Sequence, residues 1–112
     1  MVDQTAANAI VASVEAGFDE QVRVTQELVR RPSLRGQEAT AQDYLARELG
    51  QRGFSVDRWQ IDIDAIKDMP GFSPKADGYE DAYLTVGSLR CAEPRGRSLA
   101  INGHIDVVPE GP

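Results

Sequence analysis

The chain has 112 residues, of which 41% are hydrophobic and 27% are charged, a composition typical of one globular domain. Twelve basic against eighteen acidic residues give a net charge of -6, which argues against a nucleic-acid partner because phosphate binding needs clustered Lys and Arg. No apolar run approaches the ~20 residues of a membrane span, and no signal-peptide pattern opens the chain. We therefore expect a cytoplasmic protein with no membrane partner. The lone Cys91 excludes an internal disulfide.

The first half of the chain predicts two helices. Residues 5–31 predict a helix with one core-facing stripe, which Gly17 can interrupt and Pro32 ends. The stripe recurs every fourth residue, at Ile10, Val14, Phe18 and Val22. Residues 37–52 predict a second helix, with Gly53 at its C-terminal cap. Its apolar face carries Ala41, Tyr44, Leu45 and Leu49.

The second half predicts three strands. Trp59, Ile61 and Ile63 alternate with polar residues, as in a half-buried strand, and a twist or bulge near Asp57 would bring Phe54 and Val56 into phase. Residues 83–89 predict a second strand. Residues 98–102 predict a third, whose continuous apolar run Leu99-Ala100-Ile101 indicates burial on both faces.

Two loops separate these strands. Residues 64–81 contain two prolines and two glycines and predict a long loop with one helical turn at its start. Such a loop is either a surface excursion or part of a substrate site. Glu93-Pro94-Arg95-Gly96 predicts a type I turn. The order of two helices and then three strands predicts the α/β class.

The single histidine lies in the run Asn102-Gly103-His104-Ile105-Asp106, at the end of the third predicted strand. Ligands of open α/β sheets bind at the carboxyl edge of the strands, and residues two apart in an extended backbone point to the same side. His104 and Asp106 therefore face one crevice in this interpretation.

The pair is open to three roles. His104 ligates a divalent metal while Asp106 orients it. Alternatively, Asp106 polarises His104 as a general base for a nucleophile such as Cys91 or a serine. In the third interpretation, His104 is a structural histidine beside a turn.

The longer motif Gly103-His104-Ile105-Asp106-Val107-Val108-Pro109 resembles the first metal-binding motif of the zinc-dependent aminoacylase, acetylornithine deacetylase and succinyl-diaminopimelate desuccinylase-like metallohydrolases. Pro32-Ser33-Leu34-Arg35-Gly36-Gln37-Glu38, Gly53-Phe54-Ser55-Val56 and Pro70-Gly71-Phe72-Ser73-Pro74 are similar to further segments of that family. The resemblance covers residues 20–112. It implies the N-terminal portion of a three-layer metallohydrolase catalytic domain, with residues 1–112 ending just after the first metal motif and the lid domain absent.

The resemblance also implies an activity. His104 would ligate one of two zinc ions, with cobalt or manganese as alternatives, and Asp106 would be the catalytic acidic partner that orients it. Such amidohydrolases and metallopeptidases cleave the amide bond of N-acyl amino acids or small peptides with metal-activated water.

The family's remaining metal ligands and its general base are not matched in the chain, and a catalytic zinc usually has three protein ligands. We therefore expect a chain that is inactive alone. The alternative is a non-catalytic binding or structural module that keeps the first half of the fold. Because the third predicted strand lacks neighbours, we also expect self-association, as a homo-oligomer or through its apolar edge.

Overall fold

The computed structural model describes residues 3–74, 79–80, 82–93 and 96–111, and it divides into two compact units, Met1–Arg31 and Pro32–Pro112. The predicted Asp77-Gly78 segment and the Pro94-Arg95 centre of the predicted turn lie outside the described residues. Among the described helices, none is both long enough and apolar enough to cross a membrane.

The first unit consists of two helices where the sequence predicts one. Helix α1 (Gln4–Ala16) begins at Asp3, whose side chain accepts a hydrogen bond from the Thr5 N–H at 3.1 Å, and α2 (Phe18–Val29) follows directly after Gly17. Gly17 is the point of interruption because it leaves helical geometry at φ -90° and ψ 3°. Neither helix contains a buried residue.

The prediction of a core-facing stripe in the first unit is wrong for the described structure. Ile10, Val14 and Phe18 are all exposed. A helical stripe becomes core only when another element packs against it, and residues 3–31 provide α1 and α2 alone.

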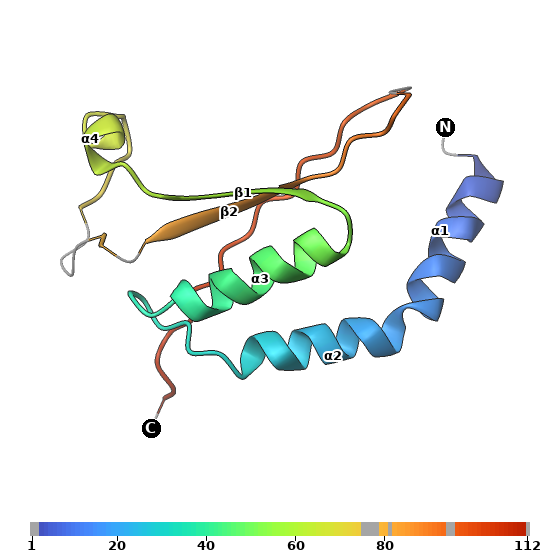
Figure 1. The fold of residues 1–112 in the computed structure, drawn as a ribbon, viewed down its shortest axis with the longest axis horizontal. Helices are drawn as coiled ribbons and strands as arrows, with labels where there is room; N and C mark the ends of the chain where they lie inside the picture. Colours follow the sequence, from blue (N-terminus) through green and yellow to red (C-terminus); the bar gives the residue numbers. More distant parts are fainter. Residues whose placement is uncertain (1–2, 75–78, 81, 94–95, 112) are drawn as a thin grey trace. The chain divides into compact units, whose positions relative to one another are not determined.

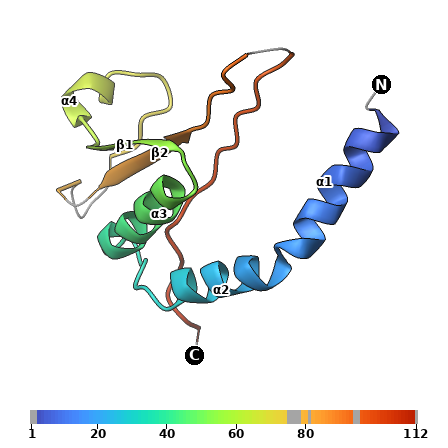
Figure 2. The same ribbon diagram turned by 45° about the vertical axis from the view of Figure 1, so that its right-hand side comes forward.

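The second unit packs one helix against a two-stranded sheet (Figures 1 and 2). Helix α3 (Ala39–Gln51) precedes strand β1 (Ser55–Gln60), the short helix α4 (Ile63–Ile66) and strand β2 (Tyr83–Ser88). β1 and β2 pair antiparallel from Ser55↔Ser88 to Gln60↔Tyr83 without a bulge. The helical turn predicted at the start of the long loop is confirmed as α4.

The unbroken ladder corrects the prediction of a bulge at Asp57. In a regular strand, alternate side chains point to opposite faces, so Val56 lies on one face and Trp59 on the other. Ile61 and Ile63 fall after the end of β1, and Ile63 begins α4. The apolar residues near Asp57 therefore alternate in two phases because they lie on opposite faces of the sheet or beyond the end of β1. No inserted residue is needed to explain the pattern.

The core of this unit lies between α3 and the sheet. Ala41 is 0% exposed and Tyr44 is 5% exposed, which confirms part of the predicted apolar face of this helix. Gly87 of β2 lies so close to α3 that an added Cβ would meet Leu49 at 3.1 Å. Across the same interface, Arg58 of β1 binds Asp43 of α3 at 2.9 Å. These contacts fix the helix on one face of the sheet.

The predicted third strand is wrong in the described structure. Residues 97–106 form no strand, and Leu99 and Ile101 are 84% and 88% exposed. A strand exists only when a neighbour completes its hydrogen-bond ladder. Within the described part of the chain, β1 and β2 form a sheet of two strands, and β2 does not pair with this segment. The elements are therefore those of an α/β protein with two strands in place of the three predicted.

Candidate functional site

The structure brings His104 and Asp106 together. His104 Nδ1 lies 2.8 Å from the Asp106 backbone oxygen and 3.2 Å from Asp106 Oδ1. The carbonyl oxygen can only accept, so Nδ1 carries the proton and donates to it. The Nε2 atom is then unprotonated in the neutral ring, with its lone pair free for a ligand. The His104 side chain is 83% exposed, so this nitrogen meets no steric barrier from the described residues.

The His104 segment is fixed by the loop that precedes α3. The Val107 N–H donates to the Ser33 carbonyl at 2.9 Å, and Leu34 and Val107 form an isolated parallel bridge. Gly36 turns this loop with a φ of 86°, in the left-handed region that favours glycine. Two segments about seventy residues apart in the sequence thus meet in space. This contact holds the backbone immediately after the His-x-Asp pair.

Sequence reasoning missed this contact. Both partners belong to segments that resemble the metallohydrolase family, Pro32–Glu38 and Gly103–Pro109, but neither segment contains a signal that identifies the other as its neighbour. A backbone bridge depends on N–H and C=O groups that every residue except proline carries. The residue types of the two segments therefore do not predict that their backbones pair.

The remaining candidates do not join the pair. Cys91 is exposed, and no hydrogen bond links it to His104 in the described part of the chain. In the long loop, Tyr79 donates its hydroxyl to the Ser73 carbonyl at 3.0 Å and its ring lies 6.3 Å from that of Phe72. The described part of this loop is therefore braced by its own residues.

The described residues fit one position of a metal site and do not make a complete one. Among residues 3–74, 79–80, 82–93 and 96–111, no group of three or more His, Cys, Asp and Glu side chains could hold a metal ion. His104 Nε2 is an available nitrogen ligand, and Asp106 is placed as the carboxylate that orients a ligating imidazole from behind. Further ligands would have to come from outside these residues.

Comparison with known proteins gives a consistent set of relatives. Over 90 residues the chain is 32% identical to the succinyl-diaminopimelate desuccinylase of Methylocella silvestris, a match covering 80% of this chain and 19% of the relative. It is 37% identical over 89 residues to the enzyme of that name from Methylobacterium nodulans, covering 79% of this chain and 18% of the relative. The Polaromonas sp. protein of that name is 29% identical over 100 residues, covering 81% and 24%.

The chain spans about a fifth of the length of the curated relatives that it matches. No protein-family model matches it, and no solved structure matches it significantly.

Proposed function

This chain belongs to the succinyl-diaminopimelate desuccinylase family, and from that premise we propose that it forms part of the metal site of a zinc-dependent amidohydrolase. The observation that carries the proposal is the hydrogen bond from His104 Nδ1 to the Asp106 carbonyl, which commits one ring nitrogen and frees the other. This arrangement suits a metal-ligating histidine, because only an unprotonated nitrogen binds a cation.

Each residue of the pair has a distinct role in the proposal. His104 would ligate the metal through Nε2, and Asp106 would hold the imidazole in the correct tautomer and orientation. When bound, zinc in such a site supplies Lewis acidity and activates water, and cobalt or manganese would suit the same donors. The substrate class follows the name of the relatives: an N-succinyl amino acid whose amide bond is hydrolysed.

The chain alone is expected to be inactive in this proposal. A catalytic zinc usually takes three protein ligands, whereas the described residues offer one good candidate. We therefore expect weak zinc binding by the isolated chain and no measurable hydrolysis. The setting in which the pair acts would be a longer polypeptide of the kind that the relatives represent, in the cytoplasm.

A chimera tests the proposal directly. The 90 matched residues of the Methylocella silvestris protein are replaced by the corresponding residues of this chain, and zinc content and hydrolysis of N-succinyl-diaminopimelate are measured. We expect an active, zinc-containing chimera. Asp106→Asn should then lower activity about 10- to 100-fold, the usual cost of removing the partner of a ligating histidine. His104→Ala should abolish activity and lower zinc content.

The matched control is Asp64→Asn, which makes the same chemical change at an exposed residue of α4 whose ion pair is with Lys67. It should leave activity unchanged. A chimera that is active and retains its zinc content after His104→Ala would refute the role assigned to His104.

The second candidate function is a non-catalytic module, and the single ligand found among the described residues is the observation that favours it. This candidate predicts a folded chimera that binds no zinc and is indifferent to a chelator. It also predicts that His104→Ala changes nothing beyond local stability.

A further inference from the structure

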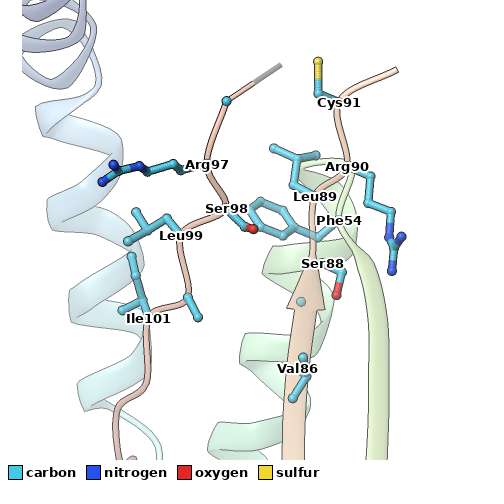
Figure 3. Close-up of a pocket in the computed structure, with 13 residues that line it drawn as sticks. Phe54, Val86, Ser88, Leu89, Arg90, Cys91, Arg97, Ser98, Leu99 and Ile101 are labelled. Atoms are coloured by element: carbon cyan, nitrogen blue, oxygen red, sulfur yellow. The ribbon is translucent and has the colours of Figure 1, made fainter. Parts of the chain in front are cut away.

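The dipeptide Asn102-Gly103 lies in an exposed and unpaired part of the chain. Both residues belong to no helix, strand or turn, and none of the hydrogen bonds in the described part of the chain involves either of them. An open groove of about 880 Å³ separates the preceding residues 96–101 from β2. Figure 3 shows Leu99 and Ile101 of this segment directed away from β2. No described contact therefore holds the backbone of the dipeptide in one conformation.

We propose that Asn102-Gly103 is a self-modification site, at which Asn102 loses its side-chain amide by deamidation. The Gly103 backbone nitrogen attacks Asn102 Cγ, a new N–C bond closes a succinimide ring, and the Cγ–Nδ2 bond breaks. Ammonia leaves with the proton that the Gly103 nitrogen gives up. Water then opens the ring at either of its carbonyl carbons. Opening at Cγ yields aspartate, and opening at the main-chain carbonyl yields isoaspartate, in which the backbone runs through Cβ and Cγ.

Gly103 removes a steric barrier to ring closure. The attacking nitrogen must approach the Asn102 side chain, and a Cβ on the following residue hinders that approach. Glycine has no Cβ and reaches backbone conformations that other residues avoid. An added Cβ at Gly103 would meet nothing within 4 Å, so the described surroundings do not crowd this position either.

The other asparagine of the chain shows what opposes the reaction. Asn8 is also exposed, but it lies within α1, where the N–H of the next residue belongs to the helical hydrogen-bond pattern. Its Oδ1 accepts a hydrogen bond from Gln4 Nε2 at 2.9 Å. Ala9 follows it and carries a Cβ. Exposure is thus common to both asparagines, and the local backbone is what distinguishes Asn102.

Deamidation would alter the backbone beside the His-x-Asp pair. It places a carboxylate two residues before His104, and isoaspartate lengthens the chain at that point, while the Val107 N–H stays bound to the Ser33 carbonyl. The NMR signals of the His104 ring should therefore shift as the product accumulates. Displacement of a metal ligand is the one consequence that rests on the proposed function, whereas the reaction at Asn102 does not depend on it.

The test incubates the full 112-residue chain at neutral pH and follows both asparagines by mass spectrometry of tryptic peptides. Cleavage after Arg23 and Arg97 places Asn8 and Asn102 in separate peptides. Each conversion adds the mass of water and removes that of ammonia, and chromatography separates the aspartate and isoaspartate products. We expect Asn102 to convert at least roughly tenfold faster than Asn8, because Asn8 reacts only after local opening of α1.

Gly103→Ala is the matched variant, because it restores a Cβ without a clash. It should slow the conversion of Asn102 several-fold and leave Asn8 unchanged. Incubation in urea should accelerate Asn8 strongly but Asn102 by less than about twofold, because α1 unfolds whereas Asn102 has no described ladder to lose. Asn102→Asp carries the charge of the product on a normal backbone, and it should reproduce the shift of the His104 ring signals only in part.

The proposal is overturned if Asn102 does not convert, or if both asparagines convert at the same rate in the folded chain. A folded-state rate at Asn102 far below its rate in urea also overturns it, since the segment would then be covered in solution. Because mass spectrometry reads the chain without activity, an inactive chimera together with rapid conversion of Asn102 would refute the proposed function and leave this inference standing.

Discussion

Two apolar surfaces of the second unit differ in burial. The face of α3 that meets the sheet is closed, with Ala41 fully buried and Tyr44 nearly so, whereas the equally apolar Leu99–Ile101 stretch is almost fully exposed. The first face has a partner within the described chain, and the second has none. This difference shows that an apolar sequence identifies residues that are stabilised by burial. Burial itself requires a second surface within contact distance.

The largest expected contrast in stability comes from truncating one residue on each surface. Tyr44→Ala should cost about 3 kcal/mol, because it leaves a cavity between α3 and the sheet. Leu99→Ala should change the free energy of unfolding by less than about 0.5 kcal/mol, the usual range for exposed positions. Urea denaturation followed by circular dichroism measures both. Equal costs for the two variants would show that residues 97–101 are covered in solution.

Two glycines, Gly87 at the interface between β2 and α3 and Gly50 on the exposed side of α3, give the next largest effect on stability. Gly87→Val should cost about 1–3 kcal/mol by overpacking, since an added Cβ meets both Leu49 and Phe54 at 3.1 Å. Gly50→Ala is the control, because nothing lies within 4 Å of its added Cβ. It should stabilise α3 by up to about 1 kcal/mol, the difference in helix propensity. A neutral Gly87→Val would mean that α3 packs less closely on β2 than described.

A smaller loss of stability is expected when the hydrogen bond between the Val107 N–H and the Ser33 carbonyl is removed. Val107→Pro removes the N–H that donates to the Ser33 carbonyl and should cost about 1 kcal/mol, the net value of one hydrogen bond. It should also broaden the NMR signals of the His104 ring, because the backbone after the pair loses its tether. Val108→Pro is the control, since the described backbone hydrogen bonds do not include the Val108 N–H. Identical spectra for the two variants would contradict an anchoring role for the Ser33–Val107 contact.

The smallest effect concerns α2, whose residues are unburied and whose C-terminal end is held by ion pairs. The pKa of the Glu27 carboxyl is held below its ordinary value of 4.5, mainly by the hydrogen bond from Arg30 and with a further contribution from Arg31. A lowered folded-state pKa stabilises the helix above the unfolded-state pKa, and this stabilisation is lost as the pH falls through the folded value. Helicity should therefore decline below about pH 4.5.

Carbon-13 NMR titration of the Glu27 carboxyl measures this pKa directly. Glu27→Gln should flatten that part of the pH profile, and a Glu27 pKa at or above 4.5 would contradict the described ion pairs.

Much of the local structure could be predicted from residue types. The period of apolar residues located α3, residues 83–89 were predicted as the strand observed as β2, and Gly17 and Gly53 lie at helix boundaries. The His-x-Asp spacing predicted that His104 and Asp106 would face one crevice at the end of a strand. The structure forms no strand there, and it places His104 Nδ1 3.2 Å from Asp106 Oδ1. Their chemical roles remain proposals, because one ligand and its partner do not make a metal site.

The sequence by itself determined the approximate positions of α3 and β2, which residues are suited to burial, and the family to which the chain belongs, because each of these depends on local periodicity and residue identity. Only the tertiary structure decided which apolar surfaces are covered, that Ser33 holds Val107, and that an open groove lies between β2 and residues 97–101. The reason is physical. Burial and strand pairing are properties of two surfaces together, and one stretch of sequence specifies only one of them.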